Sequence, residues 1–151
     1  LRFGRAAVPI INDREDYKFE IGKGEILREG SDVTIVATGI CVSSALEAAD
    51  KLAADGISAE VINIHTIKPL DTELIVKSAK KTGKVVTAEE HTIIGGLGGA
   101  VCEALSEKAP TPVLRIGIND VFGESGTAAA LVAKYGLDGA GIYAKVKEFV
   151  K

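Results

Sequence analysis

Apolar and polar positions follow one another along the chain in blocks that predict strands and helices in turn. Four short, almost continuously apolar segments predict strands, at residues 32–38, 58–64, 84–87 and 112–116. A strand that is apolar at successive positions is typically buried on both faces, as in a parallel sheet covered by helices. The pattern therefore predicts a sheet in the middle of the molecule.

The segments between these strands carry apolar residues at helical spacing. The first of them places its apolar residues on one helical face, before Gly56 as the terminator: Val42, Ala45, Leu46, Ala49, Leu52 and Ala53. A second helix is predicted to begin near Pro69 and Asp71 and to end at Gly83, and a third to cover residues 98–109. Two shorter helices are predicted at residues 127–135 and 138–150.

Alternating strands and helices with short connections predict right-handed crossovers and a parallel sheet. Residues 18–29 precede the first crossover and contain glycine bends, so we add them as an antiparallel edge. The predicted fold is α/β, with three layers and a doubly wound, mostly parallel five-stranded sheet that has one antiparallel edge strand.

The chain has 151 residues, which is most simply one domain. The polar segment 12–17 is the nearest approach to a linker, so we divide the chain into a tail at 1–17 and a domain at 18–151. The sequence contains no Met and begins with Leu1. We therefore expect it to be a fragment of a longer or processed protein.

Composition excludes several classes of partner. Apolar residues make up 46% and charged residues 26%, with a net charge of −3 and no basic cluster, which argues against nucleic acid and anionic membranes. No apolar run approaches the roughly 20 residues needed to cross a bilayer. Cys41 and Cys102 stand alone without metal-ligand spacing, so we expect buried thiols in a cytoplasmic protein.

Candidate chemistry gathers where the third predicted strand gives way to a helix. Glu89, Glu90 and His91 stand directly after that strand, where ligands bind in open parallel sheets. A metal site could combine His65 with His91 and a carboxylate, but no local spacing of metal ligands supports it. The favoured interpretation is that the three residues cap a nearby helix or contact another domain.

Two glycine-rich loops offer further alternatives. Residues 95–99 fail the dinucleotide fingerprint because Val101 stands where a small residue is needed, although their amides could hold a small anion. Residues 123–126 read G-E-S-G and lack the second spacer of a nucleophile elbow, so a serine hydrolase is not expected. The polar loop 119–127 is either a contact loop or an exposed connector.

Taken together, six segments resemble the carboxyl-terminal section of transketolase over nearly the whole chain. They are R-F-G-R-A-A-V-P (2–9), I-G-K-G (21–24), G-S-D-V-T-I-V-A-T-G (30–39), I-K-P-L-D (67–71), E-E-H-T-I-I-G-G-L-G (89–98) and F-G-E-S-G (122–126). The third domains of deoxyxylulose-phosphate synthase and of 2-oxo acid dehydrogenase β-subunits share most of these marks. The last two segments are most similar to the small subunit of split transketolases.

The resemblance implies an enzyme that transfers a two-carbon ketol unit between sugar phosphates, using thiamine diphosphate and Mg²⁺. Those cofactors would lie between the diphosphate-binding and pyrimidine-binding domains, and this chain would bind none. It lacks the Gly-Asp-Gly that opens the metal–diphosphate motif, and the catalytic glutamate would lie upstream of Leu1. The expected partners are an N-terminal transketolase subunit or domains and a second copy in a homodimer, with no activity for the chain alone.

The resemblance also points to site residues. Arg5 stands four residues before Pro9 and matches the arginine that grips a sugar phosphate, with Arg2 as the competing candidate. Interface contacts are expected at Glu89, Glu90, His91, Glu124 and Ser125. Two other readings remain: a nucleotide-binding module that holds phosphate at residues 95–99, and a regulatory or assembly domain that self-associates without a ligand.

Overall fold

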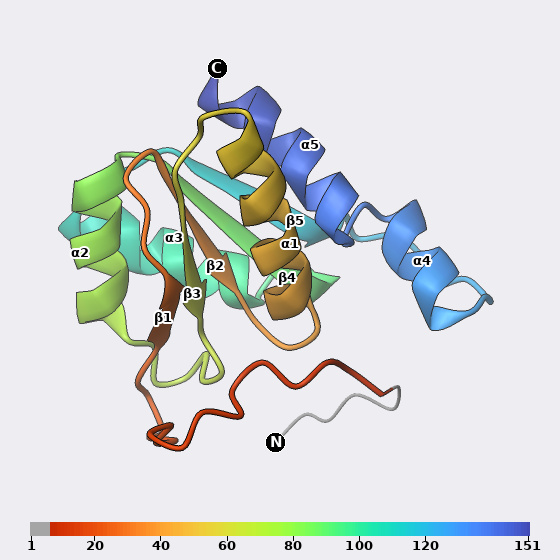
Figure 1. Cartoon of the computed structure of the whole chain (residues 1–151), viewed down its shortest axis with the longest axis horizontal. Coiled ribbons are helices and arrows are strands. Elements are labelled where there is room, and N and C mark those ends of the chain that lie inside the picture. Colours follow the sequence, from red (N-terminus) through yellow and green to blue (C-terminus); the bar gives the residue numbers. More distant parts are fainter. Residues whose placement is uncertain (1–6) are drawn as a thin grey trace.

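The computed structural model describes residues 7–151, which form one five-stranded sheet flanked by helices. The strands are β1 (Glu25–Arg28), β2 (Val33–Ala37), β3 (Ala59–Asn63), β4 (Val85–Thr92) and β5 (Val113–Ile118). The helices are α1 (Cys41–Ala54), α2 (Thr72–Thr82), α3 (Leu97–Lys108), α4 (Ala128–Lys134) and α5 (Gly139–Val150). Figure 1 shows their arrangement.

The sheet has the strand order β1-β3-β2-β4-β5, in which β1 is an antiparallel edge and the other neighbours run parallel. Side chains alternate between its faces: Val33, Ile35 and Ala37 of β2 pack with α1 and α5, whereas Val36 packs with α2 and α3. Figure 1 shows α1 in front of the sheet and α3 behind it. The predicted three-layer α/β fold is confirmed.

Helix ends follow the local chemistry that the sequence predicts. Asp71 caps α2, its carboxylate accepting a hydrogen bond from Leu74 N, and Gly83 ends that helix in the left-handed region at φ 71°.

Both cysteines are free, and the thiol of Cys41 is fully buried, which raises its pKa to about 12. None of the helices described is long and apolar enough to cross a bilayer.

Two predicted boundaries differ from the structure. Only residues 25–28 of the segment 18–29 form a strand, because the chain turns near Gly22 and bonds Gly24 N to the Asp71 carboxylate at 3.0 Å. β4 extends to Thr92, which pairs with Ile118 after a register shift. Glu89, Glu90 and His91 therefore lie within a strand, not beyond its end.

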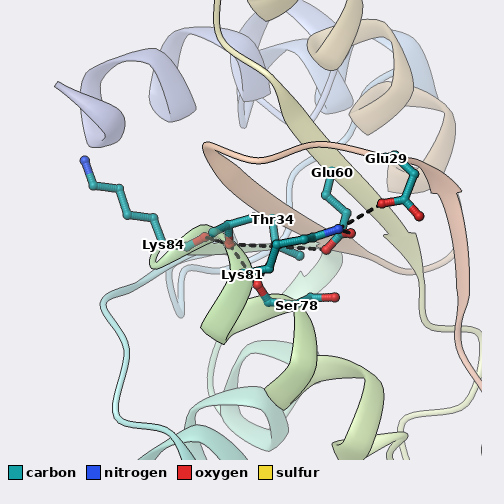
Figure 2. Close-up of polar contacts among 7 residues, drawn as sticks. Glu29, Thr34, Glu60, Ser78, Lys81 and Lys84 are labelled. Carbon is teal, nitrogen blue, oxygen red and sulfur yellow. Dashed lines mark hydrogen bonds and ion pairs between the residues drawn. The ribbon is translucent and has the colours of Figure 1, made fainter.

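A polar cluster lies inside the amino-terminal half of the sheet, where β2 and β3 meet α2 (Figure 2). Glu60 is fully buried; it accepts a hydrogen bond from Thr34 Oγ1 at 3.1 Å and pairs with the ammonium of Lys81. Lys81 also bonds the exposed Glu29 carboxylate at 2.9 Å. Hydrogen bonds from Lys81 to Glu60 and Glu29 raise the pKa of the lysine, and the bond to Lys81 lowers the pKa of Glu29.

We expect Lys81→Ala to destabilise the fold by about 2–3 kcal/mol, because Glu60 would be left buried without a cation. The cost lies below that of a fully buried pair because the Lys81 side chain is 37% exposed. Urea denaturation followed by circular dichroism measures it, with the exposed neighbour Lys80→Ala as the matched control. Adding Glu60→Gln should recover part of the loss, and equal stability of the two lysine variants would contradict the prediction.

The sign of the pH dependence follows from the raised pKa of Lys81. The pair contributes fully at pH values below the ordinary lysine pKa of 10.5, and its contribution is lost as the pH rises through the higher folded-state value. The difference in stability between the wild type and Lys81→Ala should therefore shrink at strongly alkaline pH, and the part that comes from Glu29 should also be lost as the pH falls through the lowered pKa of that carboxyl.

Candidate functional site

The predicted contact residues meet at the carboxyl edge, by which we mean the edge of the sheet formed by the carboxyl ends of β2 to β5. A cavity of about 360 Å³ lies there between the ends of β4 and β5, the loop after β5, and α4. Glu90, His91 and Glu124 all line it. The structure thus brings together three of the five residues that the sequence predicts at an interface.

Glu89 is placed differently from its neighbours. Its side chain is buried, with 2% of the residue exposed, and its carboxylate accepts hydrogen bonds from Leu97 N and Gly98 N at 2.8 Å each. These are orphan amides of the first turn of α3, so the carboxylate satisfies them and complements the positive end of the helix. The capping alternative is therefore observed for Glu89, and any effect of this residue on an interface would act through the position of α3.

Glycines make the room that the Glu89 carboxylate occupies. A Cβ on Gly96 would lie 2.0 Å from Glu89 Oε2, and a Cβ on Gly117 would lie 2.8 Å from the His91 carbonyl and 3.3 Å from Glu89 Cγ. This arrangement counts against the alternative of a phosphate site at residues 95–99. Two of the amides there, those of Leu97 and Gly98, already donate to a carboxylate of the same chain.

The loop after β5 is tied to α4 by Glu124. Its carboxylate pairs with Lys134 at 2.5 Å and accepts a hydrogen bond from the Tyr135 hydroxyl at 3.4 Å. The bond to Lys134 lowers the pKa of Glu124 and raises that of the lysine. Ser125 is exposed and is not among the residues that line the cavity. Arg5 and Arg2 lie outside the described residues.

The two histidines do not share a site. His65 bonds Thr66 Oγ1 through Nδ1 at 2.9 Å and contacts the Phe19 ring at 4.5 Å between centroids, whereas His91 lines the cavity beside α4. Residues 7–151 contain no cluster of three histidine, cysteine or carboxylate side chains able to hold a metal. With the amides of Leu97 and Gly98 also occupied, these residues do not fit a magnesium–diphosphate group.

The cavity has apolar walls that the motifs did not indicate. They come from β5, the loop after it, α4 and the turn that follows α4: Ile118, Val121, Leu131, Val132 and Leu137. A signal was present in the sequence, because residues 128–133 read A-A-A-L-V-A and are apolar on every side of a helix. Such a helix is expected to need cover on more than one face.

The other part of the carboxyl edge is overlain by the chain's own N-terminal segment. Val8, Pro9, Ile11 and Asn12 line a smaller cavity of about 270 Å³ at the ends of β2 and β3, together with residues that include Gly39, Asn63 and His65. Figure 1 shows this segment running along the edge before the chain enters β1. The edge thus includes a region under the N-terminal segment and a region beside α4.

Gly96→Ala should destabilise the fold by about 2–4 kcal/mol, because the methyl group must displace the Glu89 carboxylate and leave two buried amides unpaired. Backbone strain does not contribute, since Gly96 has φ −99°. Gly99→Ala is the matched control: nothing lies within 4 Å of its Cβ position, so the helix should gain roughly 0.5–1 kcal/mol. Thermal and urea denaturation measure the stability of both variants. Similar changes in the two would contradict the inference that Gly96 leaves space for the Glu89 carboxylate.

Comparison with known proteins agrees with this architecture. A family model described as the transketolase C-terminal domain matches residues 22–142. The 6-deoxy-6-sulfo-D-fructose transketolase subunit of Clostridium sp. (strain MSTE9) is 54% identical over 133 residues, covering 88% of this chain and 41% of the subunit. For 1-deoxy-D-xylulose-5-phosphate synthase 1 of Geobacter sulfurreducens, identity is 47% over 155 residues, covering 99% of this chain and 24% of the synthase.

A solved structure titled as a split gene transketolase, inactive beta4 tetramer, superposes with a TM-score of 0.90 and 54% identity. The match covers 96% of this chain and 47% of that chain. Our chain therefore spans less than half the length of these three relatives. The family match over residues 22–142, together with the shared fold, shows that the chain belongs to the transketolase C-terminal domain family.

Proposed function

We propose that the chain is the C-terminal domain of a split transketolase and works only with domains that it does not itself contain. The observation that most supports this is the superposition on a split-gene transketolase over 96% of the chain. The complete enzyme would transfer a two-carbon ketol unit between sugar phosphates. Thiamine diphosphate and Mg²⁺, held by the other domains, would supply the stabilised carbanion.

The role of this chain in that assembly is to bind partners and complete the enzyme. Its described residues offer a capped helix and an apolar cavity at the carboxyl edge instead of a cofactor site. We propose that Glu90, His91, Glu124 and Ser125 contact either an N-terminal transketolase subunit or a second copy of the chain. We also propose a cytoplasmic location, where its two free thiols would stay reduced.

A second candidate is the C-terminal domain of a 1-deoxy-D-xylulose-5-phosphate synthase. The 47% identity to the synthase from Geobacter sulfurreducens over 99% of this chain favours it. The two candidates differ in the reaction of the complete enzyme, which is ketol transfer between sugar phosphates for transketolase and formation of 1-deoxy-D-xylulose 5-phosphate for the synthase. They share the need for upstream domains.

Reconstitution tests the proposal directly. The chain is mixed or co-expressed with a polypeptide that carries the diphosphate-binding and pyrimidine-binding domains of a split transketolase, and ketol transfer is measured with thiamine diphosphate and Mg²⁺. We expect activity only from the combination, with each polypeptide inactive alone. Formation of 1-deoxy-D-xylulose 5-phosphate in place of ketol transfer would select the synthase, and full activity without this chain would overturn the proposal.

Arg5 is proposed to bind the phosphate of the sugar substrate. In the reconstituted enzyme, Arg5→Ala should raise KM for the sugar phosphate by roughly 10- to 100-fold, because a charge-assisted bidentate contact is lost. The effect on kcat should be smaller. Arg2→Ala is the matched control, and a KM increase confined to that variant would transfer the role from Arg5 to Arg2.

A further inference from the structure

The segment 121–135, which we call the arm, is apolar but poorly covered. It consists of the end of the loop after β5, helix α4 and Tyr135. Phe122 is 98% exposed and Val121 is 55% exposed. Six of the seven residues of α4 are apolar, yet none of them is buried. Figure 1 shows α4 extending away from the sheet beside the end of β5.

An apolar helix with no buried residue lacks the packing that normally stabilises a short helix. α4 has only two turns and begins with the Thr127 side-chain cap. Leu131 and Val132 line the cavity at the carboxyl edge. Phe122, which precedes α4 in the sequence, is exposed to solvent. The same chain therefore presents an exposed aromatic side chain and an apolar cavity of about 360 Å³.

This combination is self-complementary. In a dimer with two-fold symmetry, a patch on one copy meets the same patch on the other, so a projecting side chain and its receptor must both belong to one surface. Phe122 and the cavity meet that condition, because Val121 and Gly123 on either side of Phe122 both line the cavity. An aromatic side chain that enters an apolar pocket is the usual kind of anchor in protein interfaces.

The charges of the arm also suit a second copy. Lys134 and Glu124 lie on the same arm and pair with one another at 2.5 Å. Two arms brought together thus offer one cation and one anion each, so Lys134 of one copy can pair with Glu124 of the other without adding net charge. A surface adapted to a strongly charged partner would carry an excess of one sign.

We propose that two copies of this chain meet about a two-fold axis in an arm exchange, in which each arm keeps its place beside its own sheet and Phe122 of each copy enters the cavity between β4, β5 and α4 of the other. This inference rests on the proposed function, in which a second copy is part of the assembly. It names the surface that the second copy uses. The exchange would bury the apolar sides of α4 and the Phe122 ring that one copy leaves exposed.

Sedimentation velocity across a concentration series is the first test, with the 151-residue chain alone and without substrate or cofactor. We expect a reversible dimer whose Kd rises at least ten-fold in Phe122→Ser. Ile21→Ser is the matched control, since Ile21 is also an exposed apolar residue, at 70%, but lies before β1. A wild-type chain that stays monomeric, or equal weakening by both substitutions, would overturn the proposal.

A complementation test separates arm exchange from simple stacking of two Phe122 rings. Leu131→Glu places a charge in the cavity wall and should also weaken the dimer, while circular dichroism checks that both variants fold. A mixture of Phe122→Ser with Leu131→Glu retains one intact insertion, from the phenylalanine of one variant into the cavity of the other. We expect heterodimers in excess of either homodimer, and stacking of the rings predicts none.

Photo-crosslinking identifies the occupant. Benzoylphenylalanine at position 122 should crosslink to residues 128–137 of another copy, and a mixture of ¹⁴N- and ¹⁵N-labelled chains distinguishes these products from crosslinks within one copy. Crosslinks confined to an added N-terminal subunit would overturn the proposal. Because these measurements use no activity, a failure of arm exchange is distinguishable from a failure of the proposed enzyme function.

Discussion

The carboxylate of Glu89 at the start of α3 determines how the carboxyl edge is built. Placing an ionised group where only 2% of the residue is exposed is costly unless the charge is fully hydrogen-bonded. The amides of Leu97 and Gly98 provide that compensation, together with the positive end of the helix. The contact joins β4 to α3 and requires a residue without a side chain at position 96.

That single contact also limits what the edge can bind. In an open parallel sheet, helix amino termini near the strand ends are the usual anion sites. Here the chain fills the site at α3 with its own carboxylate, and the N-terminal segment overlies the ends of β2 and β3. A cavity with mainly apolar walls remains accessible beside α4, and another, of about 540 Å³, lies beside Lys68, Gly95 and Gly96. The cavity beside α4 is therefore better suited to a protein contact than to a phosphorylated ligand.

The sequence predicts the fold well where local chemistry decides it. Asp71, Gly56 and Gly83 mark helix ends through side-chain caps or left-handed backbone, and the continuous apolar segments correctly identify the parallel strands. Sequence-based prediction fails where residues distant in the sequence determine the local structure. The length of β4 depends on the pairing of Thr92 with Ile118, and the burial of Glu60 depends on Lys81 from α2 and Thr34 from β2. The cavity depends on where α4 lies, which no motif near Glu90 or His91 encodes.

The two edges of the sheet differ in a way that favours assembly through one of them. At the opposite edge, formed by the amino ends of β2 to β5, polar contacts link neighbouring elements. Asp32 accepts a hydrogen bond from Ser58 N at 2.7 Å, and Lys147 pairs with Asp55 at 2.8 Å. The large hydrophobic side chains left exposed among residues 7–151 all belong to segments at the carboxyl edge: Val8, Ile10, Phe19, Ile21, Ile67, Ile94, Val121 and Phe122. Exposed apolar area concentrated on one side is typical of a surface that a partner covers. Because the arm supplies the most exposed of these side chains and lies beside the cavity, a partner that covers this edge can bury both the Phe122 ring and the apolar cavity walls.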